Sequence, residues 1–235
     1  MRSDQPADLW REVRRKPARV QLLAPVCTRS PGVWRLDDEE LDEDGLGLLV
    51  IDGVLRQRVT LDGRARCELV GAGDLLRTRR DDEHGCIAIR HDWKICRSAV
   101  VAVLDAGFTS RLAAWPSVLA EIVDRAALRA HRLSLGIAIA NVSGVGLRIQ
   151  LLFWHLADRW GHVEPAGVVL ALSLEQETVG ELIGVSRSRV NMALRELERE
   201  GALQRHPSGW LLSQRPPEQL LTRYRTNRMP AQCMY

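Results

Sequence analysis

The sequence contains no run of about 18 uncharged apolar residues, the length that a membrane-spanning helix requires. The N-terminal segment also lacks the apolar core of a secretory signal. Cysteine is scarce, and the five cysteines (27, 67, 86, 96 and 233) are odd in number and widely spaced, which is not the framework of a disulfide-stapled domain. We therefore expect a cytoplasmic protein with reduced thiols and no membrane partner.

Excess charge and the usual catalytic motifs are also missing. The net charge of +3 over 235 residues predicts no general affinity for polyanions. Lysine occurs only at Lys16 and Lys94, and the other basic residues are arginines, which suit bidentate contacts to phosphate and guanine. There is no Gly-rich phosphate loop, no Gly-x-Ser-x-Gly and no His-Glu-x-x-His. The acidic runs at 37–40 and 81–83 are typical of solvated loops, so we expect no catalytic residues and no enzymatic activity.

The segment 177–197 has the pattern of two short helices joined by a tight turn at Gly184-Val185. The second helix is predicted to begin at Ser186, whose side chain can cap its first N–H groups. Val190, Ala193, Leu194 and Leu197 share one face of this helix, and polar residues lie opposite. This is the layout of a DNA-reading helix-turn-helix. The candidate DNA-binding residues are Ser186, Arg187, Ser188, Arg189, Asn191, Met192 and Arg195.

The flanking segments extend this pattern to a winged helix. An apolar helix is predicted over 147–160, followed by a loop at 162–167 and a short strand at 168–172. Ser173 and Gln176 have the spacing of a capping box for the next helix. Downstream, 202–206 and 210–213 read as two strands around the turn Pro207-Ser-Gly209.

The N-terminal half shows strand patterns and ends in a long helix. Strands are predicted at 47–51, 54–60, 64–70 and 98–104, with turns at Asp52-Gly53, Asp62-Gly63 and 71–74. This spacing is typical of an antiparallel barrel or roll. The helix is predicted over 116–141, and Gly144 and Gly146 mark a hinge. Its apolar stripe has heptad-like spacing and predicts a homodimer joined by these residues: Leu119, Ile122, Ala126, Ala130, Leu133, Ile137 and Ala140.

This order of elements resembles the Crp–Fnr superfamily of bacterial transcription regulators, over residues 21–213. The strongest motifs are 180–190, and 45–56 together with 71–75; the run 154–161 is similar to a subgroup common in actinobacteria. The resemblance implies an α+β fold. Its parts are a polar leader (1–20), a cyclic-nucleotide-binding-like β-roll (21–115), a dimerisation helix and hinge (116–142), a winged helix-turn-helix (143–215) and a tail (216–235). It also implies double-stranded DNA, a second copy of the chain, RNA polymerase and an unidentified small-molecule effector as partners.

By position in the motif, the residues with which the family contacts bases correspond to Arg187, Ser188 and Met192. Only at Arg187 does this sequence have the residue that is commonest in the family. Ser188 cannot replace a carboxylate that accepts from cytosine, and Met192 offers apolar contact to a thymine methyl. The operator is therefore expected to depart from the family's common half-site.

The effector cassette departs further from the family. Arg77-Thr78 stands where the resemblance implies Gly-Glu, the residues that would hold a ribose hydroxyl. The triplet Arg97-Ser-Ala99 has the same residue types as a later element of the family's cassette. It runs directly into the predicted strand ending at Leu104, however, and in family members that strand comes after the cassette. We interpret this match as coincidental, expect no binding of cyclic AMP, leave the effector-binding residues unassigned and predict no cofactor or metal.

Two alternative functions remain open from the sequence. Some relatives sense redox state or gases through an iron–sulfur cluster or haem, and Cys27, Cys67, Cys86 and Cys96, with His84 and His91, are the residues available for this. A cluster needs four converging thiolates, and none of these cysteines has tight ligand spacing. The second alternative is an interaction module whose winged helix no longer binds DNA, which the arginines of the recognition helix argue against.

Overall fold

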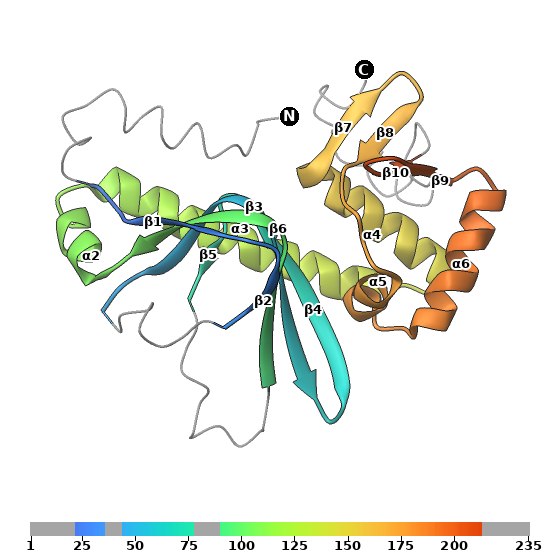
Figure 1. Ribbon diagram of the computed structural model, residues 1–235, viewed down its shortest axis with the longest axis horizontal. Helices are drawn as coiled ribbons and strands as arrows, with labels where there is room; N and C mark the ends of the chain where they lie inside the picture. The colour runs from blue at the N-terminus through green and yellow to red at the C-terminus, as the bar shows by residue number, and fades with distance from the viewer. Residues whose placement is uncertain (1–21, 36–43, 78–89, 213–235) are drawn as a thin grey trace, which may run out of the picture. The chain divides into compact units, whose positions relative to one another are not determined.

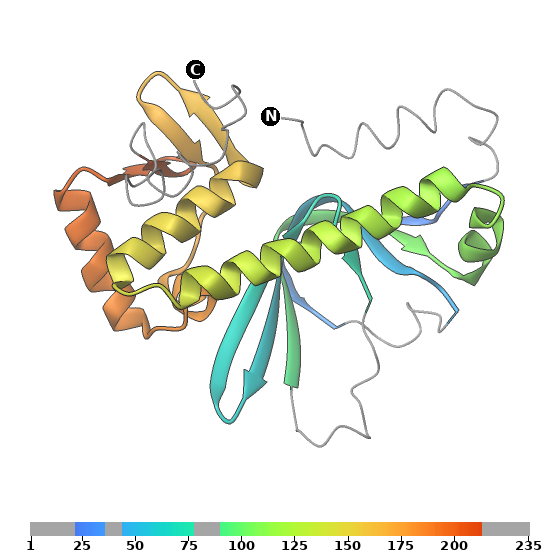
Figure 2. The ribbon, with the colours of Figure 1, turned by 180° about the vertical axis from the view of Figure 1, so that it is seen from behind.

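A computed structural model of the chain describes residues 22–35, 44–77 and 90–212 (Figures 1 and 2). The predicted leader (1–20) and the whole predicted tail (216–235) lie outside these residues. The chain divides between Leu133 and Ser134 into two compact units, called here the roll unit and the winged unit. No helix within the described ranges is both long and apolar enough to cross a membrane.

The roll unit is an antiparallel β-structure followed by two helices (Figure 1). Its main path of paired strands has the order β1-β6-β3-β4, with β2 added to β6 and β5 added to β3. The helix α3 begins in this unit and ends in the next, and Figure 2 shows it in front of the sheet. The elements are β1 (Val26–Arg29), β2 (Gly32–Trp34), β3 (Gly47–Leu61), β4 (Arg64–Gly71), β5 (Leu75–Leu76), β6 (Arg90–Leu104), α2 (Ala106–Leu112) and α3 (Pro116–Ala140).

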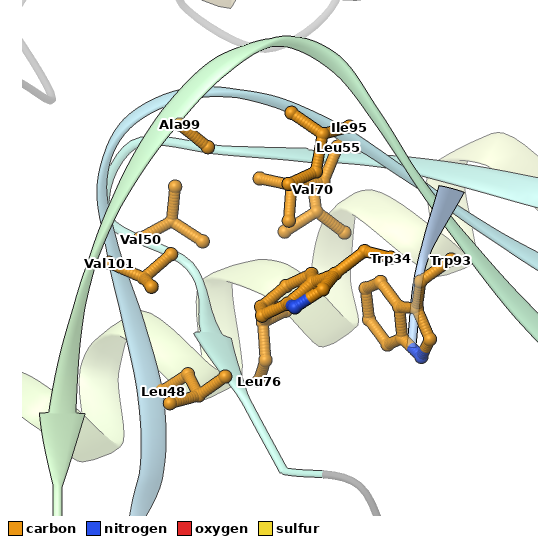
Figure 3. Packing of buried hydrophobic residues seen from close by; sticks show 10 residues of the cluster. All are labelled: Trp34, Leu48, Val50, Leu55, Val70, Leu76, Trp93, Ile95, Ala99 and Val101. Carbon is orange, nitrogen blue, oxygen red and sulfur yellow. The ribbon is translucent and has the colours of Figure 1, made fainter. Parts of the chain in front are cut away.

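Alternating apolar residues of the paired strands form the core of the roll. Figure 3 shows β3 and β6 arching over this cluster, with Leu55 and Ile95 near the bend. The Trp34 and Trp93 rings meet edge to face, with centroids 6.3 Å apart and planes at 72°. Because aromatic pairs prefer such geometry, these two residues join β2 firmly to β6. The cluster comprises Trp34, Leu48, Val50, Leu55, Val70, Leu76, Trp93, Ile95, Ala99 and Val101.

The hairpin predicted at Asp52-Gly53 is wrong. β3 runs without interruption through both residues and pairs with β6 on either side of them, with register shifts between Val50 and Leu55. Gly53 has φ 107°, and a Cβ atom there would lie 2.5 Å from the Ala99 Cα atom. The glycine is therefore required by a β-bulge, where the strands bend and their backbones approach closely.

The turn predicted at Asp62-Gly63 is confirmed. Both residues have positive φ, 49° and 69°, which is the requirement of the two-residue turn joining β3 to β4. The turn at 71–74 is also present, because the Asp74 amide donates to the Gly71 carbonyl. The short helix α2 was not predicted; Asp105 caps it by accepting a hydrogen bond from the Phe108 amide at 2.7 Å.

The helix α3 confirms the element predicted over 116–141 and has two different apolar faces. Ile122 is only 4% exposed and belongs to a second roll core with Leu104, Phe108 and Leu112. Its assignment to a dimerisation stripe is therefore wrong, because this chain's own roll covers it. The neighbouring Val123 is exposed instead.

The winged unit carries the second half of the fold (Figure 1). Its four-stranded sheet has the order β7-β8-β10-β9, so the two hairpins lie side by side. The predicted loop at 162–167 is wrong in part, because β7 occupies its first residues and pairs with β8. The capping box at Ser173 is also wrong, since the residue before α5 is Glu175 and no side chain caps there. The elements are α4 (Val145–Trp160), β7 (Gly161–Glu164), β8 (Gly167–Leu170), α5 (Gln176–Ile183), α6 (Arg187–Arg199), β9 (Leu203–His206) and β10 (Gly209–Leu212).

Candidate nucleic-acid interface and effector region

The helices α5 and α6 form the predicted helix-turn-helix. Gly184 ends α5 in the left-handed conformation, with φ 74° and ψ 36°, and α6 begins three residues later. Gly180 permits the close turn, because a Cβ atom there would lie 2.6 Å from the Val185 carbonyl oxygen. Gly184 therefore supplies the left-handed turn of this motif, and Gly180 supplies the space for the turn to approach α5.

The burial of α6 separates a packing face from a solvent face. Val190, Leu194 and Leu197 are buried, as their helical spacing predicts, and Ala193 is half-buried. Met192 is 64% exposed although it is apolar. The other exposed residues among the candidates are Ser186, Arg187, Ser188, Arg189 and Arg195, so six of the seven predicted DNA-binding residues lie at the surface of one short segment.

The two serines at the start of α6 bond to each other. The helix begins at Arg187, one residue later than predicted, so Ser186 is the residue before it, and the Ser186 hydroxyl forms no capping hydrogen bond to an N–H group. It lies 3.0 Å from the Ser188 hydroxyl instead. The predicted role of the Ser186 side chain as a cap is therefore wrong. The uncapped first turn can offer N–H donors to an external acceptor such as a phosphate oxygen.

Asn191 is the one half-buried member of the predicted set. Its Oδ1 atom accepts a hydrogen bond of 3.1 Å from Gln176 Nε2, at the first residue of α5. Sequence reasoning missed Gln176 as a partner, because the bond joins residues on two different helices and depends on how these helices cross.

The β9–β10 hairpin confirms the predicted wing. Arg205 stacks over the Trp210 ring, with its guanidinium carbon 3.9 Å from the ring centroid, and donates to Glu198 at 2.9 Å. Trp210 in turn contacts Phe153 of α4, with centroids 5.4 Å apart. The wing is thus attached both to the end of α6 and to the apolar core of the winged unit.

In the roll unit, arginines of α3 hold the region of the effector cassette. Arg129 donates to both carboxylate oxygens of Glu68, at 2.9 and 2.8 Å, to Gln57 Oε1 at 3.0 Å and to the Leu75 carbonyl at 2.9 Å. Burial opposes the charged form of Arg129, but the hydrogen bonds and charge of Glu68, with the charge of Asp74, outweigh it and raise the pKa of the guanidinium.

Asp74 extends the same arrangement. Its buried carboxylate accepts from the Gly71 amide at 3.0 Å and from Arg132 Nη1 at 3.0 Å. Residues 71–75 are therefore tied to α3 by charge-assisted hydrogen bonds. Sequence reasoning missed Arg129 and Arg132, because the partners lie roughly 54 to 72 residues away along the chain.

The residues named for a metal or redox centre lie apart where they are described. Cys27 pairs with Val101 in the sheet, Cys67 pairs with Arg58 on another strand, and Cys96 is exposed on β6. His91 is exposed on β6. Within the three described ranges, no group of three or more His, Cys, Asp or Glu side chains is arranged to hold a metal ion. Cys86, Cys233, His84 and Thr78 lie outside the described residues.

Comparison with known proteins gives one family match and many likenesses of fold. Residues 148–220 match the Crp-like helix-turn-helix domain. Among curated proteins, none matches the chain.

Solved structures of similar fold cover most of the chain. A cyclic nucleotide-binding domain containing protein from Listeria monocytogenes EGD-e is 15% identical, with 88% of this chain and 96% of that chain covered and a TM-score of 0.65. FixK2 from Bradyrhizobium japonicum is 17% identical, with coverages of 89% and 100% and a TM-score of 0.61. A CooA mutant from Carboxydothermus hydrogenoformans is 18% identical, with coverages of 92% and 94% and a TM-score of 0.60.

At these identities the likeness shows the fold, and the family match shows the type of the C-terminal domain. Residues 148–220 match the Crp-like helix-turn-helix domain, and the described part of the chain shares its fold with these solved structures.

Proposed function

We propose that this protein is a sequence-specific, DNA-binding transcription regulator of the Crp–Fnr type. The observation that carries the proposal is the solvent face of α6, where arginines, serines and Met192 are exposed within a Crp-like helix-turn-helix domain. Arginine and serine side chains can bond to base edges and phosphates, and an exposed methionine suits an apolar base contact. RNA polymerase is a further proposed partner, and the likeness of the 154–161 run to an actinobacterial subgroup stays a prediction.

In this proposal the first turn of α6 enters the major groove. Arg187 reads a base edge, and Arg189 binds phosphate on the flank of the helix, because a step of two residues turns the side chain by about 200°. The uncapped N–H groups beside Ser186 are further hydrogen-bond donors at the same end of α6, where the positive end of the helix dipole favours a phosphate oxygen. Ser188 and Met192 give this helix a different set of base contacts from the one usual in the family.

Two copies of the chain would bind together through α3. Leu119, Val123, Leu133 and Ile137 are exposed on this helix, at 41%, 57%, 41% and 64%. With the exposed Ala126 and Ala130 they recur at alternating steps of four and three residues, which is the spacing of a coiled-coil seam. Ala140 is half-buried at the end of the predicted stripe. A two-fold dimer would set two recognition helices about 34 Å apart, so the operator would be an inverted repeat.

Cyclic AMP is not the proposed effector. The cassette lacks its Gly-Glu pair at Arg77-Thr78, and the beginning of the cassette is bound by guanidinium groups of α3. Arg97 of the later triplet lies on β6, where its exposed side chain is 3.7 Å from Asp52. An effector of another class would have to fit beside these arginines.

Selection of bound fragments from genomic DNA tests the proposal. The purified chain is expected to enrich fragments that share an inverted repeat, and affinity for them should fall steeply as salt rises. An Arg187→Ala variant is the matched control, because it keeps the fold and the arginine-rich surface but loses base reading. Failure of the unaltered chain to enrich any sequence would favour the alternative of an interaction module without DNA binding.

A redox or gas sensor remains the second candidate within the same family, and its test is separate. Absorption spectra of protein purified without oxygen would reveal an iron–sulfur cluster or haem, whatever the outcome of DNA selection.

A further inference from the structure

The hydrogen bond between Gln176 and Asn191 joins the two helices of the helix-turn-helix near its polar rim. Gln176 is the first residue of α5, and Asn191 lies in the second turn of α6. Nε2 of the glutamine donates to Oδ1 of the asparagine at 3.1 Å, and both residues are half-buried. The contact lies beside the exposed residues to which DNA binding is assigned above.

This bond leaves the two ends of the asparagine amide unequal. A side-chain amide has one oxygen that accepts and one nitrogen that donates two hydrogens. An asparagine that reads adenine uses both ends at once, accepting from N6 and donating to N7. In Asn191 the oxygen already has a protein partner, whereas Nδ2 keeps its donors for the groove.

Helix geometry places the asparagine next to a base-reading arginine. Asn191 follows Arg187 by four residues, so the two side chains lie one turn apart on the same flank of α6. A donor at this position meets the base pair adjacent to the one that Arg187 contacts. At the exocyclic position of the major-groove edge, guanine O6 and thymine O4 can accept from a single donor, whereas adenine N6 and cytosine N4 are themselves donors.

We propose that Asn191 reads a keto base, guanine or thymine, and that Gln176 is a positioning residue that sets this preference. The inference rests on the proposed function, because it assigns a role within the same DNA interface. It adds one specified base position to each half-site and extends the determinants of specificity to α5.

The test is selection of binding sites from a random DNA pool with the full chain and three variants. In Asn191→Leu the base-reading amide is removed. In Gln176→Glu the new carboxylate can only accept, so it would bond to the asparagine nitrogen and turn the amide oxygen toward the groove. The matched control Gln204→Glu makes the same change on the exposed strand β9.

The unaltered chain should prefer keto over amino bases about fivefold at one position of each half-site, next to the position relaxed by Arg187→Ala. Asn191→Leu should abolish this preference, and Gln176→Glu should reverse it toward adenine or cytosine. Gln204→Glu should leave the preference unchanged. Thermal unfolding of each variant checks that the winged unit is intact.

Two results would overturn this inference but leave the proposed function standing. In the first, Asn191→Leu changes the base preference at no position of the enriched operator. In the second, one position depends on Asn191, but Gln176→Glu does not change the preference there. An unaltered chain that enriches no sequence would instead reject the proposed function, and this inference with it.

Discussion

Replacing Arg129 by methionine should destabilise the roll more than any other single change of an arginine in α3. Its guanidinium bonds both oxygens of Glu68 and also reaches Gln57 and Leu75. The side chains of Arg129 and Glu68 are 18% and 17% exposed. Methionine has a similar length and helix propensity, so the change tests the polar contacts rather than the helix.

The expected cost follows from what the substitution leaves behind. Removing one partner of a buried ion pair costs about 3–5 kcal/mol, because the other charge stays desolvated. The pair here keeps some exposure, so we expect about 3 kcal/mol of unfolding free energy. Replacing both partners, Arg129→Met with Glu68→Leu, removes the stranded carboxylate. That double variant should cost less than the single one, about 1–2 kcal/mol, mainly for the lost partner of the Leu75 carbonyl.

Urea unfolding followed by circular dichroism and tryptophan fluorescence measures these differences. Because the roll and the winged part are separate compact units, we expect the loss in the transition that exposes Trp34 and Trp93 of the roll. Arg90→Met is the matched control, since its side chain is 73% exposed and its ion pair with Asp92 is loose; its cost should stay below about 0.5 kcal/mol. The reasoning is refuted if Arg129→Met costs no more than this control, or if the double variant costs as much as the sum of the singles.

Three further predictions concern the dimer, the DNA contacts and the effector. Leu133→Asp should give monomers in light scattering and abolish operator binding. Ile122→Ala should leave the dimer intact but lower the free energy of unfolding by about 2–5 kcal/mol, because its side chain is in the roll core. An unaltered protein that is monomeric at micromolar concentration would contradict the proposed dimer. Arg187→Ala should weaken the free energy of binding to the operator by about 1–3 kcal/mol and relax the sequence preference at one base pair per half-site. Arg189→Ala should weaken binding to operator and scrambled DNA alike and lower the slope of log affinity against log salt by about one unit per half-site. The opposite pattern would mean that the two roles are exchanged. Calorimetry with cyclic AMP should show no binding, and micromolar affinity that depends on Arg97 would show that the dismissed triplet is the true phosphate site.

Where structure follows from neighbouring residues, the sequence was sufficient. The left-handed conformation of Gly184, the paired positive φ values at Asp62-Gly63 and the buried face of α6 all follow from local sterics or helical periodicity. The winged hairpin and the long helix α3 could be predicted for the same reason. The exposure of six of the seven candidate residues on α6 also follows from the position of that helix's apolar face.

Tertiary structure decided the features that depend on distant partners. Asp52-Gly53 has the composition of a turn, yet β6 pairs across it and makes it a bulge, because hydrogen bonds to a neighbouring strand outweigh a local turn preference. Helical spacing marked apolar positions on α3, but only contact with the roll distinguishes the buried Ile122 from the exposed Val123. Arg129 and Gln176 acquire their roles from partners that folding brings within about 3 Å, and no local pattern encodes such a meeting.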